Sequence, residues 1–442
     1  MSFNRDKEIR VAFDMSVLGQ GVKSGVFRVC DEIIPRLAGR PAVAPFATRR
    51  PGKNKKQSDR REKQCKEYMA GKGLDWPWHG DRPSRDVDVL FSPFYAPWAP
   101  WASDCGILKV FIAHDLIALR QPHWFENGLA QLVKHTYDSL GGEELIFAIS
   151  ENTKKDLLSY RPDIAPEKIV VAPLAAGEQF FPCQDAGKRA VMRAKYGIPV
   201  DAPYFLSLAT LEVRKNLDQI VKAFKLFLEE QPDSPACLVL AGMHGWKLDA
   251  FTAELDSLGT ARNRIILTGF VEEEDLAALY SDALCFVYMS LYEGFGLPPL
   301  EAMACGVPVI VSNTSSLPEV VGDAGILLDP HDTDGLCAAM RGILTNAAMR
   351  NELAARGLER SRRFSWDQST AIMMEAIQKE LAARSKRSSE ALGHEPPHMP
   401  HMLETQKASA IYAAARQPWK KLRRSFPDSL RSVLNCIKKR SG

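Results

Sequence analysis

One stretch of the chain, residues 283–311, constrains the fold because it reads as strand, glycine-rich loop, short helix and strand. The apolar runs 283–288 and 307–311 predict the two strands. Gly294 and Gly296 lie between them, and glycine lets a backbone come close to a ligand. Two prolines follow, where the first turn of a helix would begin. This unit predicts a parallel sheet covered by helices.

Two glutamates belong to this unit, Glu293 in the loop and Glu301 in the helix. The N-terminus of a helix attracts phosphate through its unpaired amide groups and the peptide dipoles. We expect Glu293 to contact a bound sugar and Glu301 a ribose, because carboxylates accept hydrogen bonds from hydroxyl groups. A pair of solvated surface acids is the alternative. The other residues expected to line the ligand are Gly294, Phe295, Gly296 and Leu297.

A pair of cations, Arg214 and Lys215, follows the apolar run 204–208 and precedes an amphipathic helix predicted over 217–228. Arginine offers a bidentate fork and lysine a compact charge, so the pair suits a diphosphate. A basic helix start on the surface is the alternative. Cations at a helix N-terminus interact unfavourably with the positive end of the helix dipole unless an anion compensates their charge. The position of the pair therefore favours the interpretation that it binds a diphosphate.

These elements resemble the donor site of retaining glycosyltransferases of family 4 in the GT-B class. The resemblance spans about residues 11–381 and is densest over 206–329. It implies an α/β fold of the GT-B type, with two Rossmann-like doubly wound domains facing an interdomain cleft. The expected parts are an N-terminal acceptor-side domain over 1–200, a C-terminal nucleotide-sugar-binding domain with a late crossover helix over 201–383, and a basic, aromatic-containing tail over 384–442.

The resemblance also implies roles for single residues. In the family, the Arg and Lys matched by Arg214 and Lys215 hold the pyrophosphate. A strand-ending His-Asp pair is matched by His114 and Asp115, so we expect His114 beside the transferred sugar and Asp115 either there or as a helix cap or local brace. The expected catalytic set is His114, Glu293, Arg214 and Lys215. Further donor contacts are expected at Gly21, Gly242, Phe270 and Val271, with plain turns and sheet termini as the alternatives.

Three other segments carry predictions. The basic, Lys- and Gln-rich stretch 49–66 predicts an exposed insertion or a mobile loop, with an ordinary solvated surface as the alternative. The aromatic and proline-rich stretch 95–101 predicts a loop that walls an acceptor pocket. Ser150 is predicted to cap a helix, and Glu319 to be a supporting or capping carboxylate outside the catalytic set.

Length and charge place these parts in context. A chain of 442 residues can hold two domains that each bury a core. Residues 384–440 carry thirteen Lys and Arg against four acids, so this tail has a charge of +9 and the rest of the chain −6, within a net +3. We expect the tail to bind an anionic membrane surface, with a disordered or nucleic-acid-attracted tail as the alternative. No nucleic-acid partner is expected.

The compartment is predicted from three features. Nine cysteines without CxxC spacing indicate reduced thiols. The polar segment 1–10 lacks the apolar core of a signal peptide, and no run of 18 apolar residues predicts a conventional membrane span. We expect a cytoplasmic protein, with peripheral attachment to the inner face of the membrane as an option.

The predicted function is retaining, metal-independent transfer of a hexose from a nucleotide-diphospho sugar to a glycan or lipid-linked glycan in surface polysaccharide biosynthesis. GDP-mannose is the expected donor because of the strand end His114-Asp-Leu-Ile117. No separate cofactor is expected, and no metal, because no Asp-x-Asp pair lies in a suitable loop. A nucleotide-sugar epimerase of the same fold and a noncatalytic glycosyltransferase-like scaffold are the alternatives.

Overall fold

The computed structural model describes residues 8–20, 24–49, 55–79, 87–94, 106–125, 128–243 and 249–391. The predictions for Gly21, for the loop 95–101 and for the tail after residue 391 lie outside these ranges. Within them, no helix has both the length and the apolar character needed to cross a bilayer.

The first lobe is built on a six-stranded sheet of order β2-β1-β3-β4-β5-β6, and every strand pair in it is parallel. Its strands are β1 Ile9–Asp14, β2 Val43–Thr48, β3 Val89–Ser92, β4 Leu108–Ala113, β5 Leu145–Ala148 and β6 Ile169–Val171. Its helices are α1 Gly25–Ala38, α2 Lys55–Gly71, α4 Ile117–Arg120, α5 Leu129–Asp138 and α6 Glu151–Tyr160, with 3-10 turns at Leu18–Gln20, Pro122–Trp124 and Pro166–Lys168.

The second lobe repeats this plan with a sheet of order β12-β11-β10-β7-β8-β9, again parallel throughout. Its strands are β7 Tyr204–Leu208, β8 Cys237–Ala241, β9 Ile265–Gly269, β10 Cys285–Tyr288, β11 Val309–Ser312 and β12 Ile326–Leu328. Its helices are α7 Ala186–Tyr196, α8 Leu217–Glu230, α9 Asp249–Asp256, α10 Glu273–Ser281, α11 Leu297–Ala304, α12 Leu317–Val321, α13 Thr333–Thr345 and α14 Ala347–Ser361, with 3-10 turns η4 Val213–Lys215 and η5 Gly259–Arg264.

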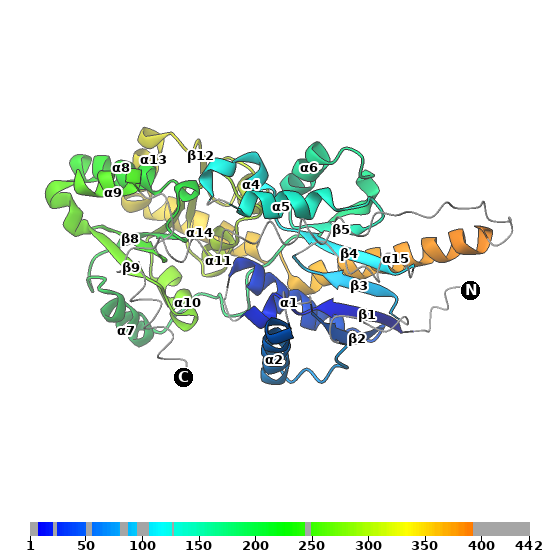
Figure 1. Cartoon of the computed structure of the whole chain (residues 1–442). Coiled ribbons are helices and arrows are strands. Elements are labelled where there is room, and N and C mark those ends of the chain that lie inside the picture. Colours follow the sequence, from blue (N-terminus) through cyan, green and yellow to red (C-terminus); the bar gives the residue numbers. More distant parts are fainter. Residues whose placement is uncertain are drawn as a thin grey trace.

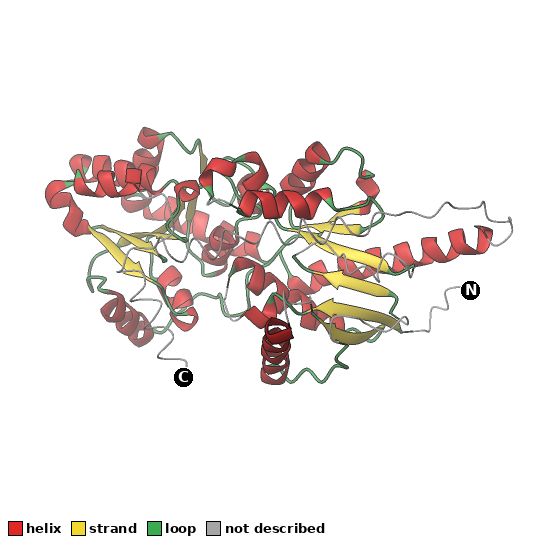
Figure 2. Ribbon diagram, viewed as in Figure 1, coloured by secondary structure: helices red, strands yellow, loops and turns green. Residues whose placement is uncertain are grey.

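The two lobes lie side by side, each with its sheet flanked by helices (Figures 1 and 2). The long helix α15, Trp366–Ala391, follows the second lobe but packs on α1 and β5 of the first. The helix α7 precedes residue 200 but packs on α10 of the second lobe. One hydrophobic cluster includes buried residues of both sheets and of α15, among them Phe13, Tyr204 and Met373. The lobes are therefore joined by a shared core as well as by the chain.

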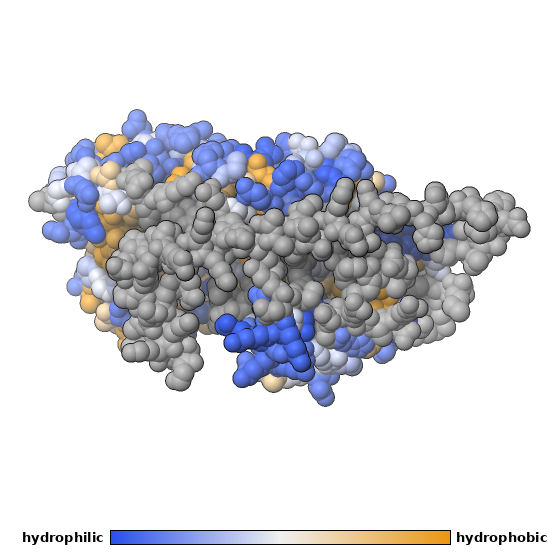
Figure 3. Space-filling view, viewed as in Figure 1, coloured by the Kyte–Doolittle hydropathy of each residue, from blue (hydrophilic) through white to orange (hydrophobic). Residues whose placement is uncertain are grey.

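The stretch 49–66 corrects one of the two predicted alternatives, the mobile loop. Residues 55–66 belong to the helix α2, in which Cys65 and Met69 are buried, and they do not form a loop. Charged residues are good helix formers, and α2 gains ion pairs one turn apart, such as Lys66 with Glu62 at 2.9 Å. A few apolar residues are enough to pack α2 on the lobe, because the opposite face of the helix forms a hydrophilic surface (Figure 3).

Core packing in the second lobe predicts a stability effect at Phe224 in α8. This side chain is fully buried, and its ring stacks on that of Phe227 with centroids 5.7 Å apart. Phe224→Ala should lower the free energy of unfolding by about 3–5 kcal/mol, because it leaves a cavity. Val191→Ala, at a position that is 69% exposed on α7, should change it by less than about 0.5 kcal/mol. Urea unfolding followed by circular dichroism measures both, and equal effects would contradict the packing described.

Candidate active site

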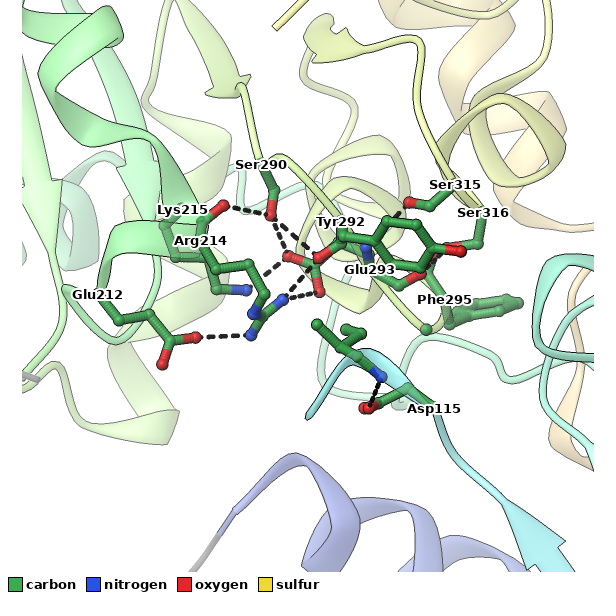
Figure 4. A network of polar contacts seen from close by, with 12 residues as sticks. Asp115, Glu212, Arg214, Lys215, Ser290, Tyr292, Glu293, Phe295, Ser315 and Ser316 are labelled. Atoms are coloured by element: carbon green, nitrogen blue, oxygen red, sulfur yellow. Dashed lines mark hydrogen bonds and ion pairs between the residues drawn. The ribbon is translucent and has the colours of Figure 1, made fainter. Parts of the chain in front are cut away.

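The carboxylate of Glu293 lies at the centre of a buried polar cluster at the C-terminal ends of the second-lobe strands (Figure 4). Arg214 Nη1 is 2.6 Å from Glu293 Oε2, and Lys215 Nζ is 2.6 Å from Oε1. Oε1 also accepts hydrogen bonds from the hydroxyl groups of Tyr288 (2.8 Å) and Ser290 (2.6 Å). In an open parallel α/β sheet, this end of the strands is where ligands bind.

Local backbone structure brings the two cations to Glu293. They belong to the 3-10 turn η4, which follows β7 after the short connection 209–212, and Asn216 ends that turn in the left-handed conformation at φ 55°. The Asn216 side chain donates hydrogen bonds to the carbonyls of Met289 (3.1 Å) and Pro330 (2.7 Å). This asparagine, which accepts positive φ more readily than most residues, therefore fastens the turn to the loop that follows β10.

The charges of the cluster compensate one another, because Glu212 Oε1 lies 2.6 Å from Arg214 Nη2 and adds a second carboxylate to the two cations. Burial would raise the pKa of Glu293, but Arg214 and Lys215 outweigh it and lower the pKa to about 2. Burial likewise opposes the charge of Arg214, yet Glu293 and Glu212 raise its pKa above the ordinary value. Burial and the adjacent Arg214 lower the pKa of Lys215, against the opposing effect of Glu293.

The start of α11 differs from the prediction in one respect. Pro298 and Pro299 occupy its first turn and have no N–H, so they remove two of the donors that a helix N-terminus normally offers. Among the described residues, no acceptor is found for the N–H groups of Gly294, Phe295 and Gly296. An anion at this loop would therefore be bound by loop amides and by the cations rather than by the helix end.

Glu301 lies on α11 and makes its contacts away from the Glu293 cluster. It is only 3% exposed, and its two oxygens accept hydrogen bonds from Arg28 (3.0 Å) and from the hydroxyl of Tyr280 (2.9 Å). Burial raises the pKa of Glu301, and the Arg28 guanidinium opposes that shift. Sequence reasoning identified Glu301 but neither of these partners, because they are remote from it in the chain.

His114 follows β4 of the first lobe and is buried beside the loop of Glu293. Its Nε2 donates to the carbonyl of Pro93 at 2.7 Å, and burial lowers its pKa to about 4. His114 is therefore neutral at physiological pH and can exchange hydrogen bonds with a hydroxyl group but carries no charge. Asp115 is a local brace, one of the expected alternatives, since its Oδ1 accepts from the N–H of Ile117 at 3.0 Å (Figure 4).

Gly294 joins the donor loop to the first lobe. Its carbonyl accepts hydrogen bonds from the hydroxyl groups of Ser150 (2.6 Å) and Thr153 (3.1 Å) at the start of α6. A Cβ atom at Gly294 would lie 2.4 Å from the His114 carbonyl oxygen, so only glycine permits this approach. Ser150 caps α6 as predicted, by accepting from the N–H of Thr153.

Two further side chains of the second lobe reach the same helix. Glu319 of α12 accepts from the backbone N–H groups of Glu151 (2.9 Å) and Asn152 (3.3 Å), so the predicted capping carboxylate caps a helix of the other lobe. The hydroxyl of Tyr292 donates to Asp156 Oδ2 at 2.6 Å. These contacts and those of Gly294 form what we call the α6 seam.

The remaining predicted donor residues lie at strand ends or in the core. Gly242 has φ 138°, and a Cβ there would lie 1.8 Å from the Ala209 carbonyl oxygen, so the end of β8 requires glycine. After β9, Phe270 is 59% exposed and Val271 is buried. The ring of Phe295 packs against Phe364 at 5.8 Å, and Leu297 is partly buried against the core. The buried ring of Phe295 leaves only the backbone of that residue available to a ligand.

Comparison with known proteins identifies the family. The model of the family "Glycosyl transferases group 1" matches residues 188–360. The O-antigen chain mannosyltransferase B of Escherichia coli is 36% identical over 265 residues, which cover 60% of this chain and 68% of that protein. The chain belongs to the group 1 glycosyl transferases. Serotype-specific mannosyltransferase WbdA of Escherichia coli is 31% identical over 76% of this chain, and this chain spans only 40% of the length of WbdA.

Solved structures show the same fold for this group 1 chain. WaaG, a glycosyltransferase involved in lipopolysaccharide biosynthesis, aligns over 84% of this chain and 99% of its own with a TM-score of 0.60 at 15% identity. Anabaena HepE in complex with UDP and glucose aligns over 87% and 100% with a TM-score of 0.61 at 14% identity. The predicted fold class, GT-B with two doubly wound lobes, is confirmed.

The buried ion pairs of Glu293 predict a pH-dependent contribution to stability. Because its pKa falls from 4.5 to about 2 on folding, the contribution is fully present above pH 4.5 and is lost as the pH falls from 4.5 toward 2. Glu293→Gln should therefore lose on the order of 3 kcal/mol at pH 7, and the difference from the wild type should shrink below pH 4.5. Urea unfolding from pH 7 to 3.5 measures this. The exposed Glu352→Gln is the control, and a pH-independent difference for Glu293→Gln would contradict the prediction.

The close approach of Gly294 predicts that Gly294→Ala weakens the α6 seam. The added methyl group would collide with backbone atoms of His114, and these backbone atoms cannot move aside as a flexible side chain could. We expect a lower melting temperature and a larger radius of gyration by small-angle X-ray scattering. Gly71→Ala, where a Cβ meets nothing within 4 Å, should leave both unchanged. Unchanged values for Gly294→Ala would show that the seam does not depend on this contact.

Proposed function

We propose that this chain transfers mannose, with retention of configuration and without a metal ion, from GDP-mannose to a glycan or lipid-linked glycan during surface polysaccharide biosynthesis. We further propose that it belongs to family 4 of the retaining glycosyltransferases, with no separate cofactor. The observation that carries the proposal is the cluster of Arg214, Lys215 and Glu293 at the loop before α11. Cytoplasmic location and attachment of the tail to an anionic membrane are part of the same proposal.

The chemistry of the cluster supports binding of a diphosphate. A phosphate near Arg214 and Lys215 would compete with Glu293 for the same N–H donors, and the loop amides of Gly294 to Gly296 add further donors. Arg214 Nε is buried without an acceptor among the described residues, so the guanidinium has donor capacity that the protein leaves unused. A carboxylate displaced by the phosphate can accept hydrogen bonds from the donor sugar.

In the proposed reaction, the bond between the anomeric carbon and the β-phosphate oxygen breaks, and a bond from that carbon to the acceptor oxygen forms. The proton of the acceptor hydroxyl passes to the departing phosphate, so no protein base is needed. Arg214 and Lys215 stabilise the negative charge that develops on the leaving GDP. Within the described ranges, no group of three or more His, Cys, Asp or Glu side chains could hold a metal ion.

Two kinds of relative bear on the choice of donor. The relatives from Escherichia coli are mannosyltransferases, which favours mannose. The structural neighbour HepE was solved with UDP and glucose, which makes a uridine nucleotide the alternative to test.

The reaction is tested by mannose transfer from GDP-mannose to a lipid-linked glycan extract. Lys215→Ala and Glu293→Gln should each reduce the rate about a hundredfold or more, since the loss of one such contact costs roughly 2–4 kcal/mol. Lys222→Ala, at a half-exposed lysine on α8, is the control and should keep full activity. EDTA should have no effect, and NMR should show the anomeric configuration of the donor in the product. Full activity of either variant, inhibition by EDTA or exclusive use of UDP-sugars would contradict the corresponding part of the proposal.

A further inference from the structure

One ion pair connects the lobes next to the donor loop. Arg28 lies in the first turns of α1 in the first lobe, and Glu301 lies on α11 in the second. Arg28 Nη1 is 3.0 Å from Glu301 Oε1, with 32% of the arginine side chain exposed and only 3% of the glutamate. The contact joins residues 273 positions apart in the chain, so no local sequence pattern predicts it.

The pair leaves Glu301 able to bind a further partner. Oε1 accepts from Arg28 and Oε2 from the Tyr280 hydroxyl, which is one hydrogen bond per oxygen. A carboxylate has about four acceptor positions, so each oxygen can accept one more hydroxyl group. The hydrogen-bonding capacity of Glu301 is therefore not exhausted by Arg28 and Tyr280.

The surroundings of Glu301 make its charge dependent on Arg28. Burial raises the pKa of Glu301, Arg28 is the first opposing influence, Tyr280 also opposes the rise, and Glu273 reinforces it. A carboxylate this deeply buried is costly unless a cation compensates it. The titratable groups that face it are Arg28 of α1, Tyr280 and Glu273 of α10, and Cys305 directly after α11.

The other elements packed on α11 supply no second cation to Glu301 among the described residues. From α14, Gly357 lies against Met303. In α12, Glu319 is directed at α6, and in β10 the Tyr288 hydroxyl is bound to Glu293. Of the basic side chains in the described ranges, Arg28 is the one paired with Glu301.

We propose that Arg28 is a positioning residue of the donor site, which orients Glu301 so that it can hold the ribose of the nucleotide. Because Arg28 and Glu301 belong to different lobes, tight nucleotide binding then depends on contact between α1 and α11. This inference rests on the proposed function, since it requires a nucleotide at the second lobe. A purely structural tie between the lobes would affect stability but would not distinguish ligands with and without ribose hydroxyls.

The test compares binding of GDP and of 2′,3′-dideoxy-GDP to the full chain by isothermal titration calorimetry. The wild type should bind GDP about tenfold more tightly than the dideoxy nucleotide, and Arg28→Gln should bring that ratio close to one by weakening GDP about tenfold. Arg28→Lys retains the charge and should recover most of the difference. Arg36→Gln, at an α1 arginine paired with Glu32 and Glu178, should leave the ratio unchanged.

A pH series adds a readout that a structural role would not move. Without Arg28 the pKa of Glu301 rises further, so its carboxyl group becomes protonated as the pH falls and loses charge-assisted hydrogen bonds to the ribose. The GDP affinity of Arg28→Gln should therefore fall more steeply than that of the wild type as the pH is lowered. Glu301→Gln should abolish this extra pH dependence.

A double variant separates the possible outcomes. If Arg28 acts through Glu301, Arg28→Gln combined with Glu301→Gln should bind GDP no more weakly than Glu301→Gln alone. The inference would be overturned if the effects of the two substitutions on GDP affinity multiplied, or if Arg28→Gln left the ratio of GDP affinity to dideoxy-GDP affinity unchanged. Either result would leave the proposed function intact. If the wild type binds none of GDP, UDP and ADP, the proposed function fails and the inference fails with it. Thermal melts without ligand establish that each variant is folded.

Discussion

The carboxylate of Glu293, buried between Arg214 and Lys215, is the interaction on which the site depends. Each of these charges would be expensive to bury alone, so the three side chains must be buried together. The hydroxyl groups of Tyr288 and Ser290 use further acceptor positions of the carboxylate and hold it on the loop side of β10. The loop after β10 thereby takes one conformation, and the neighbouring Gly294 is placed against the first lobe.

The contact between the lobes follows from this placement. Gly294 offers its carbonyl to Ser150 and Thr153, while Glu319 caps the first amides of α6. Each of these contacts joins a side chain to a backbone group, and backbone groups must find hydrogen bonds when they are removed from water. The α6 seam therefore satisfies groups at a helix start and a loop that neither lobe satisfies alone, and it does so beside the residues proposed to bind the donor.

Sequence patterns predicted the regular elements well where apolar runs were strong. The apolar run 204–208 coincides with β7, the predicted strand 307–311 overlaps β11, and the helix 217–228 differs from α8 only at its C-terminal end. These runs are buried on both faces of a parallel sheet, which makes them near-continuously apolar and easy to recognise. The helix α2 was mistaken for a loop because its polar composition resembles that of disordered segments, although two buried residues suffice to dock it.

The sequence by itself determined the two parallel sheets, the loop before α11 and the residue types of the donor site, because these depend on periodicity, glycine and local spacing. Only the tertiary structure decided which charges meet. It paired Glu293 with both cations, of which Lys215 lies 78 positions away in the chain, and it paired Glu301 with Tyr280 and with Arg28, which lies 273 positions away. Such contacts arise when sheets and helices pack, and a one-dimensional pattern carries no distance between residues that far apart in the chain.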